Sequence, residues 1–265
     1  MSIDRREFLK LAGLAGIGAG VSGLGLSFGN SVNASQYGPT PEGLRAKRWA
    51  MVIFTDRFET EDDYTKLIKA CNYAHNIPDK LMDDRRHQVK WIWTDEYEHV
   101  FPDQHNEYMR DDIRKRIFPL MCNHCDNPPC VRVCPTKATF KRPDGIVAQD
   151  YHRCIGCRFC MAACPYGSRS FNWFDPRPYI SDINPEFPTR TKGVVEKCNF
   201  CVERLARGLK PACVEASDGK MVFGDLKDPD SDVRKVLSKH INIRRKLELG
   251  THPNVFYVIG GDEHA

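Results

Sequence analysis

Hydrophobic and polar residues follow two different periods along this chain, and together they predict a mixed α and β structure. Residues 49–54 form a continuous apolar run, WAMVIF, which is typical of a buried β-strand. Residues 60–75 instead repeat apolar side chains at the spacing of an amphipathic helix. The other predicted elements are an aromatic strand at 91–93, a basic helix over 230–249 and a final strand over 254–259.

The predicted helix at 60–75 has a clear start and a defined inner face. Thr60 can cap its first turn together with Asp63, at the spacing of a capping box. The residues that then share one side of the helix are Tyr64, Leu67, Ile68 and Cys71. Cys71 is therefore predicted to point into the protein.

The N-terminal segment, residues 1–34, matches an export signal. Arg5 and Arg6 stand before a weakly apolar, glycine-rich stretch, which is the pattern of a twin-arginine signal, and Ala34 offers a cleavage site. This pattern predicts a protein at the periplasmic or extracytoplasmic face of the membrane, exported by the twin-arginine route. The alternatives are a soluble N-terminal helix and a retained signal that serves as a membrane anchor.

Composition and charge limit what the rest of the chain can be. Hydrophobic residues make up 41% of the 265 positions, enough for a core but too few for a polytopic membrane protein. The net charge of +4 gives no argument for nucleic-acid binding. Residues 35–47 are rich in glycine and proline and predict a linker.

The twelve cysteines are the most informative residues, because their spacing is that of iron–sulfur ligands. One group follows the ferredoxin pattern C-x2-C-x2-C-x3-C-P and ends in Pro165, and a second group with a longer loop ends in Pro135. In such pairs, the fourth cysteine of each run ligates the other cluster. The predicted first set is Cys122, Cys125, Cys130 and Cys164, and the predicted second set is Cys154, Cys157, Cys160 and Cys134.

A third group begins with Cys198, Cys201 and Cys213, but Ser217 stands where its fourth ligand is expected. Cys71 is then the one cysteine of the chain without an assignment. We therefore predict that Cys71 completes a third set with Cys198, Cys201 and Cys213. The count closes on three [4Fe–4S] clusters, with iron bound through the same twelve cysteines.

Other cysteine chemistry fits the spacing less well. Two C-x2-C pairs can form a zinc ribbon, and exported cysteines often pair, so a zinc- or disulfide-stabilised binding module is the alternative of another class. Covalent haem needs C-x-x-C-H, and no C-x-x-C of this chain is followed by histidine. Cys71, alone on a helix face, has the further alternative of being a small buried hydrophobe.

The cysteine region resembles the ferredoxin-like electron-transfer subunits of the dimethyl-sulfoxide-reductase and nitrite-reductase type. The matching motifs are Asn123-His124-Cys125 through Ala138, Cys154-Ile155-Gly156-Cys157 through Gly167, and Lys197-Cys198 through Ala216. The resemblance implies an α+β fold with two pseudo-symmetric bacterial ferredoxin-like halves, long loop insertions and a C-terminal extension. Its implied bounds are a polyferredoxin-like iron–sulfur domain at 48–225, with halves at about 48–117 with 190–225 and about 118–189, and an extension at 226–265.

The chain departs from this family by lacking the ligands of one cluster. In the family a further cysteine group follows the first strand, whereas residues 55–70 here hold none and only its last member is matched, by Cys71. These missing cysteines and the one replaced by Ser217 would all bind the same cluster by the crossing rule. In family members that feed a molybdopterin enzyme, that cluster lies beside the molybdenum subunit. Its absence argues against a molybdopterin partner. An electron relay of a periplasmic molybdopterin oxidoreductase is therefore only the alternative function.

A narrower resemblance is to the extracytoplasmic iron–sulfur subunit of the sulfite-reduction-associated transmembrane complex, a heterodisulfide-reductase-like menaquinol oxidoreductase. It rests on residues 137–141, 160–164, 168–173 and 211–216. It implies a polytopic quinone-interacting membrane subunit, a c-type cytochrome and further subunits of the complex as partners. The expected function is single-electron transfer between them in anaerobic sulfur metabolism, with no catalytic residue and no small-molecule substrate of its own.

Basic residues beside the ligands are candidates for raising the cluster potentials, because positive charge favours the reduced, more negative cluster. They are Lys137, Arg153, Arg158 and Lys197. Solvated surface charges are the alternative for each of them.

Overall fold

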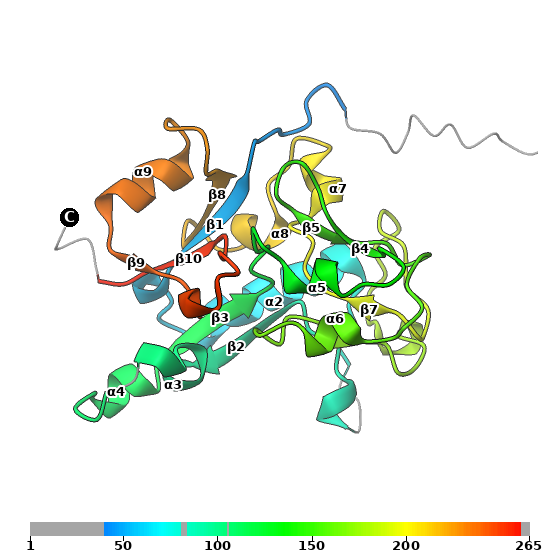
Figure 1. The fold of residues 1–265 in the computed structure, drawn as a ribbon, viewed down its shortest axis with the longest axis horizontal. Helices are drawn as coiled ribbons and strands as arrows, with labels where there is room; N and C mark the ends of the chain where they lie inside the picture. Colours follow the sequence, from blue (N-terminus) through cyan, green and yellow to red (C-terminus); the bar gives the residue numbers. More distant parts are fainter. Residues whose placement is uncertain (1–39, 81–83, 105, 261–265) are drawn as a thin grey trace, which may run out of the picture. The chain divides into compact units, whose positions relative to one another are not determined.

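The strand predicted at 49–54 lies inside the largest sheet. The computed structural model describes residues 40–80, 84–104 and 106–260, all of which fall in one compact unit. β1 (Trp49–Phe54) is antiparallel to β8 (Met221–Asp225) on one side and parallel to β10 (Val255–Val258) on the other. β9 (Asn242–Ile243) pairs with β10, so the strand order is β8-β1-β10-β9 (Figure 1).

Side chains of β1 alternate between two cores, as the pleat of a strand requires. Its even-numbered residues pack with Val233 of α9 (Asp232–Lys239), the helix that lies along β8 and β1 (Figure 1). Its odd-numbered residues face the main core, which also contains Cys71, Cys198 and Cys213. The sheet therefore forms one wall of the region that holds these cysteines.

Three small antiparallel pairs lead the chain toward the cysteine loops. They are β2 (Ile92–Glu96) with β3 (Ile117–Met121), β4 (Thr139–Lys141) with β5 (Val147–Gln149), and β6 (Ser170–Phe171) with β7 (Val195–Glu196). β3 ends directly before Cys122, and β7 ends directly before Lys197 and Cys198. Strand pairing thus fixes the points at which two of the loops begin.

One long helix confirms its sequence prediction. α2 (Glu61–His75) starts with the predicted capping box, in which the Thr60 backbone N–H donates to the Asp63 carboxylate at 3.1 Å. Cys71 points inward as predicted and is 4% exposed.

The shorter helices are α3 (Tyr97–Val100), α4 (Asp111–Arg114), α5 (Pro129–Arg132), α6 (Phe159–Ala162), α7 (Val202–Leu205) and α8 (Ala212–Glu215). Single 3₁₀ turns lie at Thr55–Arg57, Arg85–His87, Pro102–Gln104, Arg177–Tyr179 and Leu247–Leu249.

Two segments differ from the sequence predictions. The basic helix predicted over 230–249 ends at Lys239, because the following residues become extended and form β9 on the edge of β10. The linker predicted at 35–47 is attached to the fold from residue 40 on. There the Thr40 and Leu44 backbone N–H groups donate to the carbonyls of Ala206 and Leu205 at 2.9 and 2.8 Å. The signal predicted at 1–34 lies outside the described residues.

The mixture of helices and strands agrees with the predicted α+β class. β10 comes from the predicted C-terminal extension, yet it pairs with β1 inside the main sheet. β6 and β7 come from different predicted halves and pair with each other. The division into two ferredoxin-like halves stays a prediction. None of the described helices combines the length and the apolar character needed to cross a bilayer.

A buried ion pair joins several of these elements. Arg190, 3% exposed, pairs with the fully buried carboxylate of Glu196 in β7. The indole Nε1–H of Trp91 donates to the same carboxylate at 2.7 Å, and the Asn172 amide donates to its other oxygen. Arg190 also donates to the backbone carbonyl of His75. The end of α2, β7 and the segment before β2 are therefore linked through one carboxylate.

Neutralising this carboxylate is expected to destabilise the fold. Glu196→Gln leaves Arg190 as a buried cation without its counter-charge, so the free energy of unfolding should fall by about 3 kcal/mol. The matched control is Glu186→Gln at the exposed Glu186–Arg207 pair, whose loss should change the free energy of unfolding by less than about 1 kcal/mol. Anaerobic urea unfolding followed by circular dichroism measures both, and equal effects would contradict the prediction.

Candidate functional site

All twelve cysteines lie within the described residues, and none of them is paired in a disulfide. Cys71, Cys125, Cys130, Cys160, Cys198, Cys201 and Cys213 are buried. Cys122, Cys134, Cys154, Cys157 and Cys164 are half-buried. A free and mostly buried set of thiols differs from a disulfide framework, and the question is which thiols lie together.

The first set meets around one small cavity. Cys122, Cys125, Cys130 and Cys164 all line it, although Cys164 is distant from the other three in the sequence. Burial raises the pKa of Cys125 to about 12, and negative charge on the other three sulfurs acts in the same direction. The structure thus brings together the four cysteines that the crossing rule groups.

The second set lies where α5 and α6 pack against each other. Burial raises the pKa of Cys160, and negative charge on Cys154 and on the distant Cys134 adds to this effect. Backbone N–H groups reach two of the sulfurs: Thr139 donates to Cys134 at 3.4 Å and Val195 donates to Cys154 at 3.5 Å. Cys157 stands in the same loop between Cys154 and Cys160.

The third set combines Cys71 on α2 with the last cysteine group. α2 packs against α8, which carries Cys213, and both cysteines belong to one buried cluster with Cys198. Burial raises the pKa of Cys71 well above its usual value, and negative charge on Cys198, Cys201 and Cys213 raises it further. The structure therefore places the lone cysteine of the sequence beside the three cysteines that lacked a partner.

The first C-x-x-C of each cysteine group turns at the same position. The residue directly before the second cysteine has a positive φ in these three loops: 42° at His124, 71° at Gly156 and 55° at Phe200. A left-handed residue in a short loop curls the backbone so that successive N–H groups can converge on an anion, as in other iron–sulfur sites. The shared turn is therefore suited to enclosing a negatively charged cluster.

Backbone packing gives a structural reason for the glycine at position 156. The sequence motif favours a small residue here because backbone lies close to inorganic sulfide. In the structure, a Cβ on Gly156 would lie 2.4 Å from the carbonyl oxygen of Gly193. The close approach of the chain before β7 is thus sufficient to require glycine.

The donor atoms of the three sets fit [4Fe–4S] clusters. In each set, sulfurs from one loop region lie near a sulfur from elsewhere in the chain, which is the ferredoxin arrangement, and Cys157 joins the second set by its sequence position. Buried thiols with raised pKa values stay protonated without a metal, whereas coordination to iron holds them as thiolates. The iron ions of the clusters would therefore supply the positive charge that lets these cysteines bind as thiolates.

Of the four basic candidates for potential tuning, only Lys197 is buried, at 1% exposure. Lys137 is exposed, and the exposed Arg153 pairs with Asp150 at 3.3 Å. The guanidinium of Arg158 lies over the ring of Trp173, 4.7 Å from its centroid. These three are surface charges, which agrees with the alternative stated for each of them.

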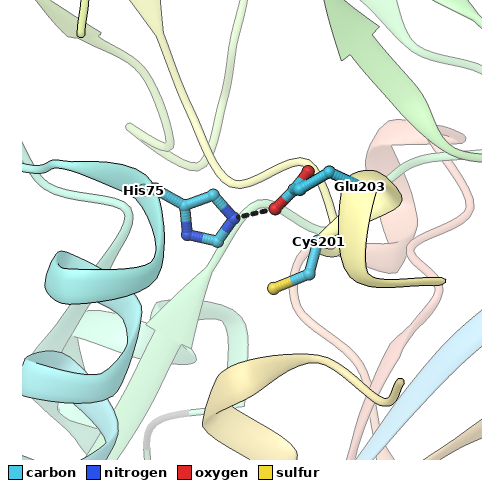
Figure 2. A group of neighbouring side chains, drawn as sticks. All are labelled: His75, Cys201 and Glu203. Carbon is cyan, nitrogen blue, oxygen red and sulfur yellow. Dashed lines mark ion pairs between the residues drawn. The ribbon is translucent and has the colours of Figure 1, made fainter. Parts of the chain in front are cut away.

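Sequence reasoning missed a histidine and a carboxylate beside the third set. Nε2 of His75 lies 2.7 Å from the Glu203 carboxylate, and both groups lie within 4.8 Å of the Cys201 sulfur (Figure 2). Nδ1 of His75 lies 3.1 Å from the carbonyl oxygen of Cys71. Burial alone would raise the pKa of Glu203, but the hydrogen bond and charge of His75 lower it below its usual value. The i, i+4 spacing of Cys71 and His75 was the available signal.

Comparison with known proteins agrees with this chemistry. Residues 113–176 match the 4Fe-4S dicluster domain. The Hdr-like menaquinol oxidoreductase iron-sulfur subunit 1 of Archaeoglobus fulgidus is 41% identical over 98% of this chain and 100% of the relative. The menaquinone reductase iron-sulfur cluster-binding subunit of Nitratidesulfovibrio vulgaris is 34% identical over 80% and 88%. The B subunit of polysulfide reductase from Wolinella succinogenes is 43% identical over 72% and 86%. The chain therefore belongs to the family of [4Fe–4S] electron-transfer subunits that includes these menaquinol oxidoreductase and polysulfide reductase subunits.

Proposed function

We propose that this subunit passes single electrons through three [4Fe–4S] clusters between a quinone-interacting membrane subunit and a redox partner such as a c-type cytochrome. The setting is a respiratory complex of anaerobic sulfur metabolism. The observation that supports it best is the position of Cys71, which stands among Cys198, Cys201 and Cys213 although it is remote from them in the sequence. With it, the proposal assigns every cysteine of the chain to a set of four.

When bound, each cluster supplies a one-electron centre. The chain's own residues hold these centres in fixed positions, because the crossed cysteines tie α5 to α6 and α2 to α8. Backbone N–H groups, such as those of Thr139 and Val195, donate to ligand sulfurs and favour the reduced form. The main core that contains Cys71, Cys198 and Cys213 shields that set from water.

The proposed partners follow from the similar proteins. One relative is named as a menaquinol oxidoreductase subunit and another as a menaquinone reductase subunit, and both match most of this chain. A membrane subunit that exchanges electrons with menaquinone is therefore the proposed partner on one side. The twin-arginine motif at Arg5 and Arg6 supports an extracytoplasmic position, where a c-type cytochrome can accept or donate electrons.

Replacing Cys71 tests the cluster count. The wild-type chain should bind about 12 irons, and Cys71→Ser should lose up to about 4 of them, because one cubane loses a thiolate ligand. Iron analysis with electron paramagnetic resonance should show one signal lost or converted and two retained. Ser217→Ala is the matched control and should keep the full iron content, since Ser217 is engaged with backbone groups of Val214 and Met221. Three intact cubanes in Cys71→Ser would show that Cys71 only packs.

Isolation of the intact complex tests the partners. A tagged chain, purified anaerobically from its own host membranes, should bring with it a polytopic membrane protein and covalently bound haem. In that complex, a soluble menaquinone analogue should reoxidise the reduced clusters faster than it does in the isolated chain. Equal rates would contradict a quinone-interacting partner, and a co-purified molybdopterin subunit would favour the molybdopterin relay instead.

Changing the twin arginines tests the location. Replacement of Arg5 and Arg6 by lysine should retain the protein in the cytoplasm, because the export route depends on this pair. Cell fractionation and immunoblotting measure the distribution. The control is replacement of Lys10 by arginine, which leaves the pair intact and should not change the location. Export of the double-lysine variant at the normal level would contradict the assignment.

A further inference from the structure

Arg169 is a buried cation between the first and second sets of cysteines. It is 6% exposed and lines the cavity that the first set surrounds. Its Nη1 donates to the Thr139 hydroxyl at 3.1 Å and to the Gln149 amide oxygen at 3.2 Å. These two acceptors lie on the β4–β5 pair and are themselves joined by a 2.6 Å hydrogen bond. The guanidinium is thus held in one orientation by neutral groups.

The other side of this guanidinium lacks a conventional partner. Within the described residues, Nη2 of Arg169 is buried and has no nitrogen or oxygen atom as a hydrogen-bond partner, and no carboxylate forms an ion pair with Arg169. Arg190 shows the contrast, because its buried charge is met by Glu196. A buried cation without an anion is strongly unfavourable, so the site requires negative charge from another source.

The nearest source of negative charge is the ligand sulfurs. Arg169 lines the cavity of the first set together with Cys122 and Cys130. It also donates to the hydroxyl of Thr139, whose backbone N–H donates to the Cys134 sulfur of the second set at 3.4 Å. The same guanidinium therefore lies beside both proposed cluster sites.

We propose that Arg169 is a positioning residue that serves as the shared counter-charge of the first and second clusters and raises the reduction potential of both. The proposal rests on the proposed cluster sets. Uptake of one electron by either cluster adds one unit of negative charge, and no bond forms or breaks. A fixed cation nearby stabilises that reduced form through Coulomb attraction in a weakly screened interior. One residue thereby keeps two neighbouring centres close in potential, which suits electron transfer in either direction.

Lys197 provides the comparison, because it is a second buried cation with different neighbours. Its Nζ donates to the carbonyl oxygens of Val147 and Cys198. Its charge acts on Cys198 of the third set and on Cys130 of the first set. Removal of its charge should therefore affect a different pair of clusters from removal of the Arg169 charge.

The test is a redox titration of the full-length chain, followed by electron paramagnetic resonance. Arg169→Gln should lower the midpoint potentials of two clusters, each by about 59 mV for a tenfold weaker one-electron reduction, and leave the third unchanged. Arg169→Lys should restore most of the shift, because the charge is retained. Lys197→Gln should shift one of these two clusters and the third. Iron analysis checks that each variant holds its clusters.

The Cys71→Ser background identifies the shifted pair. There the third cluster is lost or altered, so both remaining cubanes should respond to Arg169→Gln. Unchanged potentials at full iron content, or a shift of only one cluster, would overturn the shared role. If Arg169→Gln loses iron, Arg169→Lys decides the question. Midpoint potentials near those of wild type support the role, and midpoint potentials lowered by about 59 mV overturn it. If wild type holds only two cubanes, the proposed cluster count fails, and the response of these two to Arg169→Gln still tests Arg169.

Discussion

Buried sulfur atoms from distant parts of the chain must share space with one another, and the rest of the structure depends on this constraint. As free thiols they are weakly polar and can pack, but as thiolates they would repel each other at these positions. Iron removes the conflict, because coordination deprotonates the thiols and supplies positive charge at the same place. Folding and cluster binding are therefore linked. In the proposed ligand sets, the helix pairs α5 with α6 and α2 with α8 would be stabilised both by packing and by the metal that their cysteines share.

Buried cationic side chains are neutralised in two ways in this fold. The way differs between a cation that stabilises the structure and cations that lie beside the proposed cluster sites. Arg190 is neutralised by Glu196, which ties α2, β7 and the region before β2 together and is a structural solution. Arg169 and Lys197 have neutral hydrogen-bond acceptors on one side and ligand sulfurs on the other. Charges that an ion pair has cancelled act weakly on a redox centre. Charges left without a carboxylate, beside the centre, act strongly on it.

Local chemistry explains which features could be predicted from the sequence. The capping box of α2 and the cysteine spacings depend on residues close together in the chain, so pattern alone identifies them. Cys71 was assigned by elimination; the structure places it beside Cys198, Cys201 and Cys213, and its role as a ligand stays a prediction. α9 was predicted too long, since the residues after Lys239 leave the helix to pair with β10, and the local pattern holds no sign of that pairing. Arg169 and Glu203 gave no sequence signal, because their contacts arise from tertiary neighbours, and His75 gave only its i, i+4 spacing from Cys71.

The region where the resemblance implies a fourth cluster shows why Cys71 stands alone. The positions that would supply its ligands, residues 55–70 and Ser217, lie in segments that are joined to each other by protein contacts. Asp63 pairs with Lys220 at 3.2 Å, and the Arg57 guanidinium donates to the Gly219 carbonyl oxygen at 3.3 Å. Ser217, at the position of a ligand, donates instead to the Val214 carbonyl oxygen at 2.7 Å and accepts from Met221. Hydrogen bonds and ion pairs thus perform the joining that iron would otherwise perform. In the proposed cluster arrangement, the third set is the last redox site on this side of the chain, and Cys71 faces that set.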